Sequence, residues 1–331
     1  MRKRPVFSDV LAWLLVALMG LLGAFSFLMM RYGWKIYLEL FSHFQVQYLI
    51  IDVALCAVVI LLRCRWQTYI GLFLVVLFAL PVLGWYSASA FDVFPTFEQP
   101  AHLRILSANV NTKNDQYEKV LSYVRSHQPD MVAFIEVDDV WQQQLDDLRD
   151  LLPYAYGKTS PDNFGLLLYS KQPLENVRTD YFGTEDYVSV VAQTTFQGAP
   201  ITLVATHPPP PIRADIFHTR NRQLDVIQQF LSTVNTEKIV VGDLNITMWS
   251  PYYRRFVNKA KLANTRKGVG IMPTWPARHH KIPTILTPLF QIPIDHCLTS
   301  DGLSTQRISV EGDLGSDHKP LLVDVVLNGA S

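Results

Sequence analysis

The sequence is poor in cysteine and has no excess of either charge. Its three cysteines, Cys56, Cys64 and Cys297, have neither the spacing of a zinc site nor the pattern of a disulfide framework. The 29 basic and 29 acidic residues balance over the whole chain. Residues 1–90 contain only seven of the basic and three of the acidic residues, so 22 basic and 26 acidic residues follow, with a net charge of −4. This acidic remainder does not favour strong non-specific binding of nucleic acid, which depends on neutralising phosphates.

Hydrophobic residues make up 49% of the sequence, and they are concentrated in residues 1–90. Three apolar runs there predict membrane-spanning helices at about residues 11–30, 40–62 and 67–88, because a helix needs about 20 residues to cross a bilayer. One such run could be a signal peptide or a buried core helix, but three in succession favour a membrane region. Asp52, in the second run, must then face another helix or water.

Positive charges flank these runs unequally. Basic residues precede the first run and separate the second from the third, whereas the opposite loop carries only Arg31 and Lys35. The N-terminus is therefore expected in the cytoplasm, and the chain beyond three spans is expected outside it. We predict a transmembrane region at residues 1–90, a linker at 91–101 and a globular domain at 102–331. The protein would be integral to a bacterial inner or plasma membrane.

The globular domain alternates between patterns typical of strands and of helices. Apolar runs such as residues 103–108 and 131–135 predict buried strands, and helical spacing predicts helices at 115–127 and 220–234. Long stretches of predicted strand with some helical crossovers favour stacked β-sheets flanked by helices over a simple doubly wound sheet.

Polar residues directly follow six of the apolar runs in this domain. They are Asn109, Glu136, His207, Asp243 with Asn245, Asp295, and Asp317 with His318. Strand ends in layered α/β folds gather at one edge and hold their side chains rigidly, so these residues could converge on one site. Taken singly, an Asp or Asn after a strand is often a turn residue, and a lone His is more often structural or exposed. Six such positions in order favour a common site.

The types of these residues indicate a particular chemistry. Hard divalent cations such as Mg²⁺ prefer carboxylate and amide oxygens, which are supplied here by Glu136, Asp317, Asp243, Asn109 and Asn245. No cluster of cysteines or paired histidines suggests zinc. Two histidines with carboxylates nearby suit proton transfer at neutral pH. Hydrolysis of a phosphoester needs both a cation that neutralises developing charge and a base that activates water, so the set favours that reaction.

Seven short segments, taken in order, carry a family resemblance. They are residues 106–110 (LSANV), 134–136 (FIE), 165–174 (GLLLYSKQPL), 206–207 (TH), 242–245 (GDLN), 292–296 (IPIDH) and 315–318 (GSDH). Together they resemble the endonuclease/exonuclease/phosphatase superfamily, to which deoxyribonuclease I belongs, over about residues 103–327. The resemblance implies a four-layer α/β sandwich, in which two packed β-sheets lie between outer helices.

The resemblance also implies a metal site. Glu136 would bind Mg²⁺ or Mn²⁺, with Asn109 and Asp317 close to the ion. These three are therefore the candidate metal residues.

The same resemblance assigns catalytic roles to five residues. His318 would act as the general base or hold the attacked phosphate, and Asp295 would pair with His318 and orient it. Asp243 would orient the attacking water or the leaving oxygen, and Asn245 would hold a phosphate oxygen. His207 matches the second histidine of the family. Several members pair that histidine with a mid-domain Glu, for which this sequence offers several acids without a clear choice: Asp162, Glu175, Asp180, Glu185 and Asp186.

The sequence leaves the substrate open. Arg213, after a proline-rich loop, and Trp275, in a long basic insert, could contact the substrate. The linker of about ten residues favours a phosphodiesterase or phosphatase that acts on a lipid headgroup or another phosphoester near the membrane. The alternatives are a membrane-bound nuclease and a catalytically silent binding module. No obligate protein partner is evident from the sequence.

Overall fold

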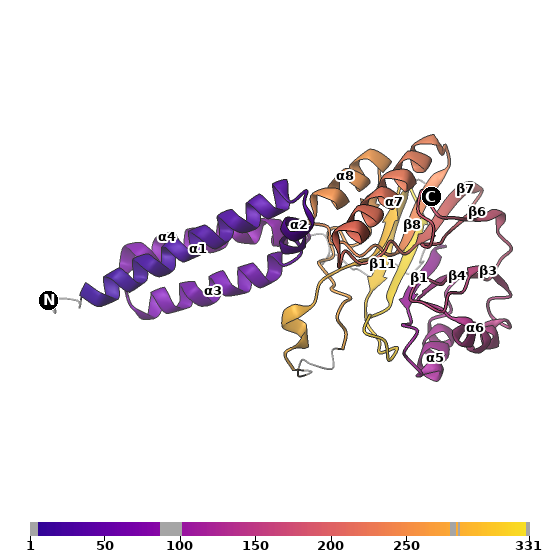
Figure 1. The fold of residues 1–331 in the computed structure, drawn as a ribbon, viewed down its shortest axis with the longest axis horizontal. Helices are drawn as coiled ribbons and strands as arrows, with labels where there is room; N and C mark the ends of the chain where they lie inside the picture. Colours follow the sequence, from indigo (N-terminus) through magenta and orange to yellow (C-terminus); the bar gives the residue numbers. More distant parts are fainter. Residues whose placement is uncertain (1–5, 87–100, 279–282, 284, 329–331) are drawn as a thin grey trace.

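The structure is a computed structural model that describes residues 6–86, 101–278, 283 and 285–328. A bundle of helices extends from one side of a layered α/β domain (Figure 1). The predicted linker at residues 91–101 lies outside the described residues except for Ala101.

The bundle contains four helices, namely α1 (Val6–Tyr32), α2 (Ile36–Ser42), α3 (Gln45–Leu61) and α4 (Arg65–Leu83). By length and composition, α1 and α4 can each cross a membrane. The second predicted span is broken, since α2 and α3 meet at an angle of 62° and form a third crossing only if they are counted as one. Many large apolar side chains point outward from these helices, as Leu14, Leu21 and Phe73 do, whereas Asp52 is fully buried. This inverted burial suits a lipid environment.

The domain contains two six-stranded mixed sheets. The first has the order β11-β12-β1-β2-β4-β3, and its strands are β1 (Leu103–Asn109), β2 (Met131–Ile135), β3 (Tyr154–Lys158), β4 (Leu166–Ser170), β11 (Leu303–Ser309) and β12 (Leu321–Leu327). The second has the order β5-β6-β7-β8-β10-β9, and its strands are β5 (Glu175–Asp180), β6 (Ser189–Phe196), β7 (Ala199–Thr206), β8 (Glu237–Asp243), β9 (Ala263–Asn264) and β10 (Asp295–Thr299).

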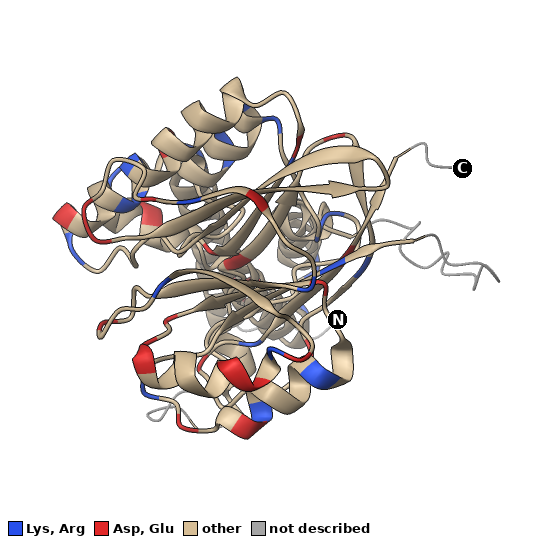
Figure 2. Ribbon diagram, turned by 90° about the vertical axis from the view of Figure 1, so that its right-hand side faces the viewer, with Lys and Arg blue, Asp and Glu red and all other residues tan. Residues whose placement is uncertain are grey.

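Helices cover the outer face of each sheet. They are α5 (Tyr117–His127) and α6 (Asp139–Leu145) with the 3₁₀ turn η2 (Asp146–Leu148) on the first sheet, and α7 (Ala214–Thr233) and α8 (Pro251–Ala260) on the second. Figure 2 shows the two sheets stacked between these outer helices. A further 3₁₀ turn, η3 (Thr287–Phe290), lies in the insert before β10. The predicted four-layer α/β sandwich is confirmed.

Strand β2 explains why a continuous apolar run forms a strand here. Met131, Ala133 and Ile135 belong to the core between the two sheets. Val132 and Phe134 pack instead with residues of α5 and α6. Successive side chains of a strand point to opposite faces, and both faces of this strand are buried.

The sheet topology brings the polar strand ends together. β1 runs parallel to β2, and β7 runs parallel to β8, so Asn109 and Glu136 follow one edge of the first sheet and His207 and Asp243 follow one edge of the second. β10 is antiparallel to β8, with Asp295 opposite Asp243. Four of the six predicted positions lie at the ends of strands, whereas Asp295 begins β10, and Asp317 and His318 lie in the loop before β12.

Candidate active site

The strand-end residues line one cavity of about 970 Å³. Glu136, His207, Asp243 and Asn245 contribute to its wall, together with Asp317 and His318 from the loop before β12. Six of the eight predicted catalytic and metal residues are thus brought to a common surface.

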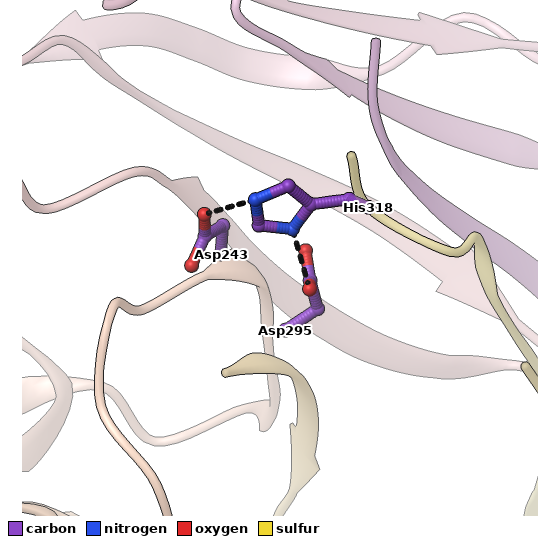
Figure 3. A group of neighbouring side chains, drawn as sticks. All are labelled: Asp243, Asp295 and His318. Atoms are coloured by element: carbon purple, nitrogen blue, oxygen red, sulfur yellow. Dashed lines mark hydrogen bonds and ion pairs between the residues drawn. The ribbon is translucent and has the colours of Figure 1, made fainter. Parts of the chain in front are cut away.

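A buried histidine between two carboxylates forms the centre of the site (Figure 3). His318 Nδ1 lies 2.9 Å from Asp295 Oδ2, and His318 Nε2 lies 3.6 Å from Asp243 Oδ2. The exposed fractions of the three side chains are 5% or less. Asp295 accordingly lies behind His318, while Asp243 lies at its other ring nitrogen.

The three groups shift one another's pKa values. Burial alone would lower the pKa of His318, but the charges of Asp295 and Asp243 outweigh it and raise that pKa to about 10. Burial opposes ionisation of Asp295, yet its pKa is lowered by His318. Burial and the neighbouring Asp295 raise the pKa of Asp243. These shifts favour a charged His318–Asp295 pair beside a carboxyl group, that of Asp243, which resists ionisation.

Glu136 has the properties of a metal ligand. It directly follows β2 with a φ of 61°, a left-handed conformation that costs energy for a non-glycine residue. Its Oε1 accepts a hydrogen bond from Asn109 Nδ2 at 2.9 Å, and its buried Oε2 has no hydrogen-bond partner among the described residues. Burial raises the pKa of Glu136 to about 7. An unpartnered carboxylate oxygen in an acidic cavity fits a hard divalent cation.

Asp317 is held by two side chains from distant segments. Asn111 Nδ2 donates to its Oδ1 at 2.7 Å, and Trp275 Nε1 donates to its Oδ2 at 3.1 Å. Trp275 also lines the cavity, as expected for a residue near the substrate. Asn111 was not among the predicted site residues, although it lies only two residues after Asn109.

Asn109 and Asp295 are the predicted catalytic and metal residues that do not line the cavity. Asn109 lies just behind the wall, where its amide nitrogen is 2.9 Å from Glu136 Oε1 and 3.4 Å from Asp243 Oδ2. Its Oδ1 accepts from the backbone N–H of Asn111. In this arrangement Asn109 orients the carboxylates through its amide group.

Within the described residues, the carboxylate and histidine groups that lie close enough to share a metal ion are Asp243, Asp295 and His318. The hydrogen bond between His318 and Asp295 already uses a potential ligand atom of each. Glu136 and Asp317 therefore remain the better candidates for the cation, with Asp243 at the boundary between the two groups.

His207 and Asn245 form the other side of the site. Asn245 Nδ2 lies 3.2 Å from His207 Nε2 and donates to the carbonyl of Pro208. Burial, and then the charge of His318, lower the pKa of His207 to about 3. His207 Nδ1 has no hydrogen-bond partner in the described part of the chain, so no mid-domain acid orients it. A neutral His207 is suited to hydrogen bonding with a ligand.

Arg213, which the sequence analysis offered as a substrate contact, and Arg266 both lie away from the cavity. Arg213 is exposed and pairs with Asp215 at 2.9 Å. Arg266, in the basic insert, is fully buried and donates to the carbonyl of Met272. Its charge contributes to the lowered pKa of Asp295, after the larger effect of His318. Arg266 therefore supports the site from the interior.

The sequence profile described as Endonuclease/Exonuclease/phosphatase family matches residues 106–318, more than half of the chain. No curated protein matches the sequence closely enough to count as a relative.

Solved structures share the fold. Zebrafish (D. rerio) TDP2, complexed with a single-strand DNA product, matches with a TM-score of 0.55 and 17% identity, over 68% of this chain and 99% of that one. The mannosyl-6-phosphatase Bt3783 of Bacteroides thetaiotaomicron matches with a TM-score of 0.55 and 17% identity, over 68% and 100%. The catalytic domain of human Nocturnin matches with a TM-score of 0.54 and 17% identity, over 69% and 95%. At these identities the similarity establishes the fold alone.

Proposed function

Because the chain belongs to the endonuclease/exonuclease/phosphatase family, we propose that it is a membrane-anchored phosphoesterase that depends on Mg²⁺ or Mn²⁺. Members of this family are hydrolases that act on phosphoesters and generally use a divalent metal. The observation that carries the proposal is the buried His318 between Asp295 and Asp243, in a cavity that also holds Glu136 and Asp317.

Glu136 and Asp317, supported by Asn109, would hold the cation, which would stabilise negative charge on the phosphoryl oxygens. Asp295 would fix His318 so that Nε2 faces the cavity. Asp243, 3.6 Å from that nitrogen, would orient the attacking water. Asn245 and the neutral His207 would hold phosphoryl or leaving-group oxygens. The water oxygen bonds to phosphorus, the ester P–O bond breaks, and the proton passes to the leaving alkoxide.

We assign residues 1–90 to the anchor and 102–331 to the catalytic domain, in a bacterial inner or plasma membrane with the domain outside the cytoplasm. The apolar helices α1 and α4 and the distribution of positive charge support this topology. Protease added to intact cells should cleave the domain without cell lysis. Protection of the domain until lysis would reverse the assigned orientation.

A substrate panel tests the activity directly. The purified full-length chain with Mg²⁺ should be offered plasmid DNA, an abasic duplex, phospholipids and a bis-aryl phosphodiester. Hydrolysis of at least one ester that is lost with EDTA and restored by Mg²⁺ or Mn²⁺ is the expected result. Cleavage of DNA alone would favour the nuclease alternative. No hydrolysis of any ester with either cation would favour the silent binding module.

Replacing Glu136 with glutamine is expected to weaken metal binding. Loss of the charged oxygen should raise the Mg²⁺ concentration that gives half-maximal activity. Removing a residue that only hydrogen-bonds to a metal ligand typically costs about 10–100-fold in metal affinity, and we expect a change at least as large here. Titration of activity with Mg²⁺ measures this change. Glu175→Gln, on the exposed edge strand β5, is the matched control. A normal Mg²⁺ requirement in Glu136→Gln would refute the role of Glu136.

A further inference from the structure

The wall of the cavity is not built by the sandwich alone. Leu40, His43 and Phe44, from α2 and the turn between α2 and α3, line the same cavity as Asp243 and His318. From this turn α3 runs beside α1 and α4, away from the sandwich (Figure 1). A ligand in the cavity therefore contacts the membrane region as well as the catalytic domain.

A buried ion pair holds α2 against the sandwich. Glu39 Oε1 lies 3.1 Å from Arg220 Nη2 of α7, and both side chains are fully buried. Arg220 Nη1 also donates to the backbone carbonyl of Asn245 at 2.9 Å. On the other side of Glu39, His43 Nε2 lies 3.3 Å away, and His43 Nδ1 lies 2.9 Å from Thr247 Oγ1. These contacts make α2 a fixed part of the cavity wall.

Exposed apolar side chains occur in the cavity wall, in α2 and in the segment around η3. Ile212, which lines the cavity, is 74% exposed, and Ile285, beside η3, is 86% exposed. Phe290 in η3 and Phe41 in α2 are also exposed. Such a surface is costly in water and is typical of a segment that contacts a membrane.

The residue that follows η3 contacts the first turn of α3. Gln47 Nε2, in the first turn of α3, donates to the carbonyl of Gln291, directly after η3, at 3.2 Å. Ile292, the next residue, lines the cavity together with Leu40. In Figure 1 this short helix lies on the side of the sandwich from which the helical bundle extends. The segment that carries the exposed Phe290 and the cavity-lining Ile292 thus contacts the first turn of α3.

The residues that line the cavity include an acidic group and an apolar group. Glu136, Asp243, Asp317 and the histidines are suited to a phosphoester and a cation, as described above. Leu40, Phe44, Ile212 and Ile292, with Pro210 and Pro211, provide an apolar wall. A volume of about 970 Å³ is large for a phosphate group and lies within the range of sites for larger organic ligands. An amphiphile, which has a polar head and an apolar chain, would match both groups.

The geometry points to a lipid phosphoester as the substrate, an inference that rests on the proposed function. The phosphoester lies beside the acidic group. The hydrocarbon chain lies along Leu40, Phe44 and Ile212 and extends from there toward the bilayer. Hydrolysis proceeds as above, with water bonding to phosphorus, the ester P–O bond breaking and the proton going to the leaving alkoxide. The membrane region therefore contributes to substrate binding in addition to anchoring the enzyme.

A series of water-soluble esters with growing alkyl chains tests this inference. The full-length chain in detergent, with Mg²⁺, is given alkyl phosphate monoesters and p-nitrophenyl alkyl phosphodiesters with chains of about two to eight carbons. Each buried methylene contributes roughly 0.8 kcal/mol, or about fourfold in binding, so kcat/KM should rise by up to that factor per methylene. In Leu40→Ser and Phe44→Ser the rise should be clearly smaller. Leu38→Ser, on the same helix but outside the cavity lining, should keep the wild-type slope.

The slope within one variant does not depend on the fraction of folded enzyme, so a poorly folding variant still gives an interpretable result. A flat series in the wild type, together with hydrolysis that requires His318, would overturn the lipid inference and leave the phosphoesterase proposal intact. An equal slope in wild type, Leu40→Ser and Phe44→Ser would also overturn it. Failure to hydrolyse any ester would overturn both proposals.

Discussion

Replacing His318 with alanine is expected to lower kcat by about 10²–10⁴-fold, the range typical of a positioned acid–base group. The imidazole lies between Asp295 and Asp243 and lines the cavity together with Glu136, so its removal takes this partner away from both aspartates. Hydrolysis of the best ester from the substrate panel, at saturating Mg²⁺, measures the effect. His218→Ala, at an exposed position of α7, is the matched control and should retain activity.

Asp295 gives this prediction a second test. Asp295→Asn keeps the size of the side chain but removes the charge that pairs with His318 Nδ1, so it should also lower kcat. Groups that act as one unit have non-additive effects. The double variant should therefore be little worse than His318→Ala alone. Independent, multiplying losses, or a His318→Ala enzyme with near-normal kcat, would contradict the proposed pair.

Replacing Arg220 with methionine is expected to destabilise the protein by about 3–5 kcal/mol, the usual cost of leaving one partner of a buried ion pair unpaired. Glu39 would keep a charge in a fully buried position, and the carbonyl of Asn245 would lose its donor. The midpoint of thermal unfolding in detergent measures the loss. Increased protease cleavage between the helices and the sandwich should accompany it.

A double variant separates the effect of the lost ion pair from the effect of the lost packing of Arg220. In the double variant Glu39→Gln, Arg220→Met, the uncompensated charge is gone, so much of the stability should return. Arg222→Met, at an exposed position two residues along α7, should change stability by no more than about 0.5 kcal/mol. If Arg220→Met were as stable as Arg222→Met, the ion pair would not hold α2 in place.

The apolar runs and the strand-end pattern predicted much of the molecule, because both depend on neighbours in the sequence. The composition of residues 11–30 predicts an apolar helix long enough to cross a membrane, irrespective of the rest of the fold. The buried run 131–135 makes a strand because both of its faces are apolar. The edge strands β3 and β5 and the helix α8 were missed, since the exposed edge strands carry weak apolar patterns and α8 begins with its own cap at Ser250 rather than with an apolar run.

The candidate site divides in the same way. Asp295 begins β10, and Asp317 and His318 precede β12, but Asn109, Glu136, His207 and Asp243 were predictable because the direction of the strand that each one ends or follows places it at the sheet edge. The partners of those residues were not. Asn111 and Trp275 meet at Asp317, and Arg266 turns inward behind Asp295, through contacts between distant segments.

The sequence by itself determined that apolar helices precede a sandwich whose strand ends carry carboxylates and histidines. Only the tertiary structure decided that the second apolar run breaks near its start, and that the short helix α2, which ends within that run at Ser42, contributes to the wall of the cavity. The physical reason is that Glu39 and Arg220, the two residues that hold α2 against the sandwich, are far apart in the sequence. Glu39 in an apolar helix is unfavourable by local rules, and it is compensated by His43, one turn further along, and by Arg220, which the fold brings within 3.1 Å.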